Sequence, residues 1–266
     1  MRSSGSGTSE FRYALTTLSD DPVRVPEELL ERAVFDGVVC PSCRRIRPGS
    51  GPIDIEVTGL GSPQVALNFT DRFPSELKVA RTDFLDLFGH AARHHLALGE
   101  VRDATNKKLA GYVTVWAKGR LVLVRGGAES EHHGCCPQCG NIVYLPIGGP
   151  WHVLRSDLPP GPIHLWLYGL LVDAELVSRL ERGRWKKLSV SKVRVVDEPL
   201  DGHPADLTRK VYVPPKRLTP EEEQRQIQEM LERWRQKPRL TKDDLPPHLR
   251  QMADDMERWK QEHEND

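Results

Sequence analysis

The chain has 266 residues, 38% of them hydrophobic, so it can bury a core and is not expected to be disordered throughout. Its 38 Lys and Arg residues are balanced by 38 Asp and Glu residues, which excludes the overall positive field that draws proteins onto nucleic acid or anionic membranes. No stretch approaches the roughly 20 apolar residues that span a bilayer, and residues 1–10 hold no apolar stretch behind a positive start, so the sequence predicts a cytoplasmic location.

The predicted elements follow in chain order from composition and from the spacing of apolar residues. Residues 1–24 begin with a run rich in Ser and Gly and are expected to be flexible. Residues 25–200 are expected to form an α+β core, because strand-like segments alternate with segments that have the spacing of short helices. The predicted strands are 65–69, 112–116, 121–124, 162–166 and 193–196, and the predicted helices lie near 84–88 and 171–180. Strands 112–116 and 121–124 flank a turn at 118–120 and are predicted to pair as a hairpin.

Four of the five cysteines fall into two Cys-x-x-Cys turns, which we call knuckles. Each knuckle aims two thiolates at one point, and the Pro and Gly residues around it let backbone NH groups face the sulfurs. Two knuckles together supply four thiolates, the complete ligand set of a structural zinc ion, with no open position for water or substrate. The sequence therefore predicts one zinc-ribbon-like, non-catalytic Zn²⁺ site formed by Cys40, Cys43, Cys136 and Cys139.

The separation of the knuckles leaves alternatives open. Zinc ribbons usually place about 15 to 20 residues between their knuckles, whereas residues 44–135 intervene here. The knuckles could instead form separate sites that recruit His132, His133 or Cys135, or the site could lack metal or act as a redox dithiol. We favour one zinc, because loop closure costs only about 0.6 kcal/mol per doubling of loop length while structural zinc binds with about 10–16 kcal/mol.

An internal repeat emerges when the two knuckles are superimposed. Cys40 falls on Cys136 at an offset of 96 residues, and segment 65–69 then falls on 162–166 to within a residue. The offset becomes 92 for the helix and strand that follow. Each half reads as knuckle, strand, helix and strand, so we expect two similar halves sharing one metal site, with a chance alignment as the alternative.

The composition changes after Pro199. Residues 201–218 are rich in Pro and are predicted to be a linker or a draped arm, in which only 211–213 could pair as a strand. Residues 219–266 carry two helix start signals and are predicted to form a helical hairpin. One apolar face of each helix is a candidate partner-binding surface, and packing of these faces on each other or on the core is the alternative. The face residues are Ile227, Met230 and Trp234, then Leu249, Met252, Met256 and Trp259.

No catalytic constellation is recognisable in the sequence. It has no Gly-rich phosphate loop, nucleophile elbow or paired-acid motif. His90 and His94 share a helical face at metal-compatible spacing, but the residues between them lack the Glu of a zinc protease motif, so a solvated helix end is favoured. The chain is therefore not predicted to be an enzyme.

Two short basic clusters are candidate nucleic-acid contacts. Their cationic side chains suit phosphate groups, and the tryptophan in the second cluster offers a surface on which a base could stack. Solvated surface charge is the alternative explanation for such short runs. The residues are Arg44 and Arg45 in the first cluster and Arg184, Trp185, Lys186 and Lys187 in the second.

The two cysteine motifs, the strand at 165–167, the helix at Leu176 and the closing strand at 193–196 resemble the double-CxxCG family, known mostly from myxobacteria. The resemblance covers about residues 35–198. It implies that the four paired cysteines are the family's cysteines and that Gly140 is the final glycine of the second motif. In the first motif Arg44 stands in place of glycine, so loss of the left-handed turn is expected there.

Some members of this family are immunity proteins that protect a cell from a sibling's delivered toxin. The resemblance therefore implies a bacterial, zinc-stabilised protein that neutralises a cognate toxin by binding it. The alternative is a zinc-ribbon module that binds nucleic acid or regulates another protein. A protein partner is expected in the first case, nucleic acid in the second, and a membrane in neither.

Overall fold

The computed structural model describes residues 10–17, 21–62, 65–126, 132–146, 148, 150–180, 185–201, 203, 206–216 and 219–236. The chain divides into two compact units, Met1–Pro214 and Pro215–Asp266. The core was predicted to end near residue 200, but residues 206–214 belong to the first unit. These residues belong to the first unit because they pair with the second knuckle, where Tyr212 N donates to Cys135 O at 2.9 Å.

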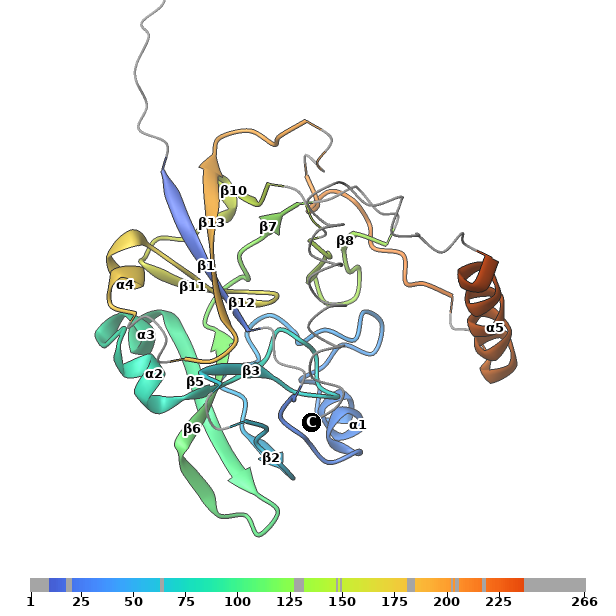
Figure 1. The fold of residues 1–266 in the computed structure, drawn as a ribbon, viewed down its shortest axis with the longest axis horizontal. Helices are drawn as coiled ribbons and strands as arrows, with labels where there is room; N and C mark the ends of the chain where they lie inside the picture. Colours follow the sequence, from blue (N-terminus) through green and yellow to red (C-terminus); the bar gives the residue numbers. More distant parts are fainter. Residues whose placement is uncertain are drawn as a thin grey trace, which may run out of the picture. The chain divides into compact units, whose positions relative to one another are not determined.

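The first unit contains a six-stranded sheet in the order β11-β12-β1-β13-β10-β7 (Figure 1). Its strands are β1 (Phe11–Thr17), β7 (Val124–Arg125), β10 (His152–Leu154), β11 (Ile163–Trp166), β12 (Gly169–Val172) and β13 (Leu188–Val196). Strand β1 pairs with β12 on one side and β13 on the other, so the prediction that residues 1–24 are flexible is wrong for residues 11–17. Ala14 and Leu15 explain the difference, because both are fully buried at the centre of the strand.

The same unit contains a five-stranded sheet in the order β2-β5-β6-β4-β3. Its strands are β2 (Ile55–Val57), β3 (Leu67–Phe69), β4 (Lys78–Arg81), β5 (Leu96–Asp103) and β6 (Lys108–Ala117), and a separate pair consists of β8 (Gly134–Cys135) and β9 (Ile142–Val143). The helices are α1 (Leu29–Phe35), α2 (Thr82–Asp86), α3 (His90–His95), α4 (Ala174–Ser178) and a 3-10 turn η1 (Arg155–Asp157). The predicted α+β class is confirmed, with strands in the majority.

The predicted hairpin around residues 118–120 does not form. Strand β6 pairs with β4 and β5 in the five-stranded sheet, whereas β7 pairs with β10 in the six-stranded sheet. The turn signal marks the point where the chain leaves one sheet for the other. Val122 N donates to Leu165 O at 3.1 Å, so the segment after the turn joins the six-stranded sheet instead of folding back on β6.

Five strands of each sheet follow the same order and the same directions. In β3-β4-β6-β5-β2 and in β11-β12-β1-β13-β10 the first three pairings are antiparallel and the last is parallel. Leu67 pairs with Ala80 in one sheet and Ile163 with Val172 in the other, at offsets of 96 and 92 residues. Strands β5 and β13 begin at Leu96 and Leu188, again 92 residues apart. These offsets equal those of the predicted sequence repeat.

The two sheets take their central strands from different places in the chain. Strand β1 precedes the first knuckle but lies between β12 and β13, which follow the second knuckle. Strand β6 lies between β4 and β5, and all three strands follow the first knuckle and precede the second. Figure 1 shows β1 running alongside β13. The five-stranded sheet therefore comes from one continuous segment, residues 55–117, whereas the six-stranded sheet takes β1 from before the first knuckle and its other strands from residue 124 onward.

One hydrophobic core cluster joins the two sheets. It contains Leu15 and Leu165 from the six-stranded sheet together with Leu67, Val79 and Val115 from the five-stranded sheet. Helices α2 and α4 contribute apolar side chains to the same cluster. Since burial of apolar area is the main stabilising term in folding, the two sheets are expected to unfold together. No helix among the described residues is long and apolar enough to cross a bilayer.

The second unit contains helix α5 (Pro220–Gln236). Its predicted start is confirmed as a reciprocal capping box, in which Glu222 N donates to Thr219 Oγ1 at 3.2 Å and Thr219 N donates to Glu222 Oε2 at 2.9 Å. The second helix of the predicted hairpin lies outside the described residues.

Candidate metal centre

The first knuckle is a tight hairpin closed by backbone hydrogen bonds. Val39 forms an antiparallel bridge with Ile46, and Cys40 N donates to Arg45 O at 2.9 Å. Arg44 N donates to Cys40 O at 2.9 Å, and Arg44 adopts a left-handed backbone with φ of 56°. The expected loss of the left-handed turn at this position is therefore wrong, because Arg44 adopts the conformation that a glycine would take.

The second knuckle repeats this geometry. Strands β8 and β9 pair Cys135 with Ile142, and Cys136 N donates to Asn141 O at 2.8 Å. Gly140 N donates to Cys136 O at 2.8 Å, and Gly140 has a φ of 72°. Both turns therefore present the two sulfurs of a knuckle in the same way.

The two knuckles bring their four sulfurs together. Cys40 Sγ lies 4.0 Å from Cys136 Sγ, and Cys43 Sγ lies 3.6 Å from Cys139 Sγ. All four sulfurs lie within 4.8 Å of one another, and none of these cysteines forms a disulfide. The edge of a tetrahedron with metal–sulfur bonds of about 2.3 Å is about 3.8 Å long. The sulfurs therefore already hold the spacing of a tetrahedral metal site.

Burial and backbone NH groups act in opposite directions on these thiols. Burial raises the pKa of Cys43 far above its ordinary value, and the Arg45 NH group opposes this only in part. Burial also raises the pKa of Cys139, to about 11, against the Asn141 NH group. Burial acts on Cys136 too, but the NH groups of Cys139 and Gln138, together with hydrogen bonds to the Cys139 and Cys43 side chains, outweigh it and lower its pKa to about 7. Four thiolates this close together repel one another, so full ionisation of this cluster requires a cation among the sulfurs.

The residues that could have extended the ligand set point elsewhere. Cys135 Sγ lies 3.5 Å from Gly140 O and is outside the four-sulfur cluster. His133 Nε2 accepts a hydrogen bond from Leu145 N at 3.1 Å, and His132 Nδ1 lies 3.0 Å from Val213 O. The alternative of two separate sites that recruit these residues is therefore wrong for the described structure.

Residues 206–214 cover the metal centre, and sequence reasoning did not place them there. Val211 forms a parallel bridge with Cys135, and Cys135 N donates to Lys210 O at 2.6 Å. The Tyr212 side chain is 7% exposed and packs in the cluster formed by the cysteines. We call residues 206–214 the strap. In the sequence only the strand-like triplet 211–213 indicated that this segment could pair. Of the two predicted alternatives, a draped arm describes the strap better than a linker.

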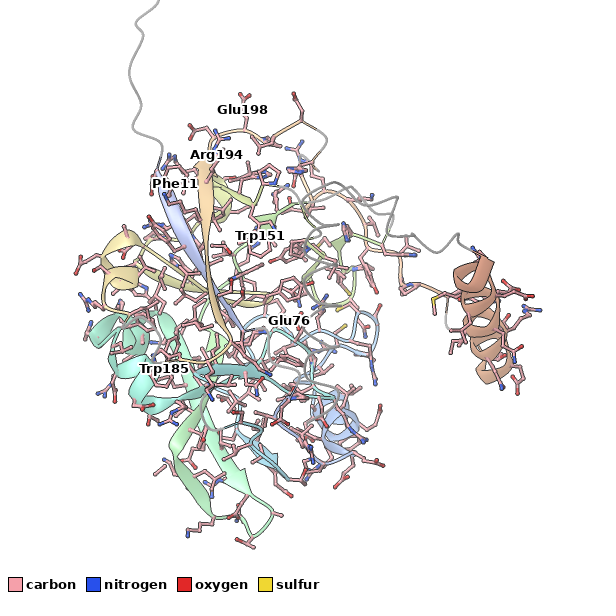
Figure 2. The ribbon with its side chains drawn as sticks, in the orientation of Figure 1. Phe11, Glu76, Trp151, Trp185, Arg194 and Glu198 are labelled. Atoms are coloured by element: carbon pink, nitrogen blue, oxygen red, sulfur yellow. The ribbon has the colours of Figure 1, made fainter. Side chains whose placement is uncertain are left out.

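The predicted nucleic-acid residues do not form one surface. Arg44 pairs with Glu31 at 2.8 Å, and Arg45 pairs with the buried Glu76 at 2.6 Å. Trp185 packs edge-on against Phe84, with ring centroids 5.4 Å apart. Figure 2 shows Glu76 and Trp185 well apart on the molecule. Lys186 and Lys187 are exposed beside Trp185, and Arg184 lies outside the described residues.

The remaining predicted site residues lie apart from the metal centre. The imidazole rings of His90 and His94 stack 5.5 Å apart at the surface, and the only metal-binding cluster in the described part of the chain is the set of four cysteines. In α5, Ile227 and Met230 are exposed. The side chain of Trp234 and residues Leu249, Met252, Met256 and Trp259 lie outside the described structure.

Comparisons with known protein families, with curated proteins and with solved structures find no match to this chain. The resemblance to the double-CxxCG family therefore stays a prediction. What the geometry defines is a preformed site of four cysteines that can hold one metal ion between two knuckles. With all four positions supplied by protein sulfurs, the metal would have no vacant position for substrate, which suits a structural role.

Proposed function

We propose that Cys40, Cys43, Cys136 and Cys139 bind one structural Zn²⁺ ion. Four thiolates in a tetrahedral arrangement are the typical ligand set of structural zinc, whereas oxygen ligands would favour calcium or magnesium. The spacing of the sulfurs supports this assignment. The ion would tie residues near position 40 to residues near position 136 and so hold the two knuckles together.

The zinc joins two halves that arose by duplication. The matching strand orders and the offsets of 96 and 92 residues support this part of the proposal. A shared hydrophobic core cluster already joins the two sheets. The zinc would add a second junction at the knuckles, so the first unit would behave as one rigid scaffold.

The scaffold acts as a non-catalytic binding protein, and its partner is a bacterial toxin that it neutralises by occlusion. The carrying observation is the closed four-sulfur centre, which provides rigidity without a reactive metal position. The resemblance to the double-CxxCG family supplies the immunity role, in a bacterial cytoplasm. The exposed apolar side chains of α5, Ile227 and Met230, are candidate partner contacts.

A protection assay tests this proposal. The toxin encoded beside the gene is expressed in a host cell together with the full chain, and survival is compared between the wild type, Cys43→Ser and Cys135→Ser. Protection by the wild type and Cys135→Ser, but not by Cys43→Ser, is the expected result. The purified toxin should also form a stable complex with the wild type after nuclease treatment. Absence of both protection and complex would contradict the immunity role.

The purified chain also allows a test of the alternative function, a module that binds nucleic acid. Binding to nucleic acid through the Arg44 and Lys186 clusters would fall steeply as salt is raised, because bound counterions are released. A purified chain that retains nucleic acid but no protein, and loses it on charge reversal at Lys186 and Lys187, would favour that module over toxin binding.

A further inference from the structure

A cavity of about 300 Å³ lies beside the metal centre and has no part in holding the ion. Its walls come from the chain just after the first knuckle, from the loop after β6, from the second knuckle and from the strap. The volume lies at the lower end of the range of about 300–1,000 Å³ that small-molecule sites occupy. The cavity can therefore hold a small molecule but not a nucleotide or a folded segment of another protein.

The walls of this cavity are mainly apolar. Ile46 and Ile142 occupy equivalent positions in the two knuckles, since Ile46 pairs with Val39 and Ile142 pairs with Cys135. Trp116 and Leu123 supply further apolar surface, and both are almost completely buried. An apolar ring or branched chain placed here would contact both knuckles at once. Its burial would contribute about 25 cal/mol per Å² of apolar surface removed from water.

Among the described residues that line the cavity, the only formal charge at neutral pH is the guanidinium of Arg120. Arg120 is exposed and has no ion pair within the described part of the chain. A guanidinium matches a carboxylate through two parallel hydrogen bonds. Among the described residues Arg120 has no ion-pair partner and no carboxylate lines the cavity to repel an anion. This arginine therefore defines the charge that a ligand should carry.

We propose that this cavity binds a small organic monocarboxylate with an apolar body, its carboxylate on Arg120 and its body against Ile46 and Ile142. A single guanidinium suits one negative charge better than the two charges of a phosphate monoester. The apolar walls favour an aromatic or branched-chain acid over a small polar acid such as formate. This binding is separate from the proposed toxin neutralisation and would persist in a chain that binds no toxin.

Cys135 provides a reporter for the cavity. It lines the cavity and is the one cysteine outside the four-sulfur cluster. In the zinc-loaded full chain an alkylating reagent should therefore modify Cys135 first, and Cys135→Ser should abolish this fast reaction. A ligand in the cavity would shield the thiol and slow its modification.

The experiment measures the alkylation rate of Cys135 with and without phenylacetate and indole-3-acetate, with phenylacetamide as an uncharged match. Calorimetry on the same samples gives the affinity. We expect each carboxylate to slow alkylation saturably and the amide to bind about tenfold more weakly, which corresponds to about 1.4 kcal/mol. Arg120→Gln should weaken carboxylate binding about tenfold and leave amide binding unchanged, whereas Arg179→Gln, an exposed control, should change neither.

Zinc content and circular dichroism verify that each variant is folded. Arg120→Gln is expected to fold, because Arg120 is exposed. Equal binding of acid and amide, or carboxylate binding that is indifferent to Arg120→Gln, would overturn the proposal. So would the absence of any protection of Cys135 by these acids at about 10 mM, a concentration well above a millimolar dissociation constant.

Discussion

Arg44 and Gly140 occupy the same position in the two knuckles, although one carries a long charged side chain and the other carries none. Their φ angles are 56° and 72°, and each donates its backbone NH to the first cysteine of its own knuckle, at 2.9 and 2.8 Å. A left-handed backbone costs a residue other than glycine about 1–2 kcal/mol. The first knuckle therefore tolerates a strain that the second avoids.

Alanine placed at these two positions should have unequal effects. Gly140→Ala introduces the left-handed strain and should lower the free energy of unfolding by about 1–2 kcal/mol. This backbone strain is the whole expected cost, because a Cβ atom there would meet no neighbouring atom. Arg44→Ala keeps a strain already present and loses only an exposed ion pair with Glu31, a loss of about 0–1 kcal/mol. Denaturant unfolding at fixed free zinc measures both. Equal losses would contradict the equivalence of the turns.

Single replacement of the cysteines should separate the metal ligands from their neighbour. Cys40→Ser, Cys43→Ser, Cys136→Ser or Cys139→Ser should each remove most of the bound zinc, whereas Cys135→Ser should retain one ion per chain. Zinc of this kind contributes about 10–16 kcal/mol of binding free energy, so loss of a ligand should also lower the melting temperature strongly. Metal analysis and thermal unfolding of the five variants check this. Zinc loss on Cys135→Ser would show that the assigned ligand set is wrong.

The four-cysteine cluster could be predicted from the sequence because each knuckle is a local motif with its own geometry. Pairing between distant strands could not, because it depends on partners far along the chain. Residues 11–17 follow a Ser- and Gly-rich run and show no regular spacing of apolar residues. They nevertheless pair with β12 and β13, which lie more than 150 residues further along the chain. Residues 112–116 and 121–124 carry a genuine turn signal, but each segment finds better partners in a different sheet.

Local signals at the termini of helices were more dependable than signals for pairing. The Thr219 capping box needs only residues within one turn, and it forms as expected. Tyr212, by contrast, packs at the metal centre because the strap runs beside Cys135, and nothing within the triplet 211–213 specifies that neighbour. Gly134 permits this approach, since a Cβ atom there would lie 2.4 Å from Lys210 O.

Removal of the metal should release the strap. Its backbone is held by Cys135, next to a ligand, and by Tyr212 packed among the sulfurs. Chelation should therefore expose the peptide bonds after Arg209 and Lys210 to trypsin, because a protease needs a locally unfolded segment. Limited digestion followed by mass spectrometry should show this cleavage at least tenfold faster without zinc.

A matched pair of variants isolates the contribution of the strap. Tyr212→Ala should keep its zinc and yet be cleaved rapidly, since only the packing of the strap is lost. Val213→Ser, at a side chain that is 57% exposed, should keep the slow cleavage of the wild type. Identical cleavage of zinc-loaded and zinc-free chains would contradict the coupling between strap and metal.

Four imidazoles form a row from the surface to the interior between α3 and β11. The ring centroids of His90 and His94 lie 5.5 Å apart, those of His94 and His95 4.8 Å, and those of His95 and His164 6.2 Å. Burial lowers the pKa of His164 to about 4, helped by the positive charges of Arg12 and His95. Burial also lowers the pKa of His95, with smaller contributions from His94 and Lys118.

Acidification should therefore destabilise the protein through His164. A base whose pKa is lower in the folded state is neutral there and binds its proton more readily when unfolded. Its contribution is complete above the ordinary value of 6.5 and is lost as the pH falls toward 4. Between pH 7 and pH 5 this loss should amount to about 1–2 kcal/mol.

His164→Gln should flatten that part of the stability profile, whereas His94→Gln, at an exposed ring, should leave it unchanged. Denaturant unfolding over this pH range, with zinc content verified at each point, measures the slopes, and parallel slopes for the wild type and His164→Gln would refute the assignment.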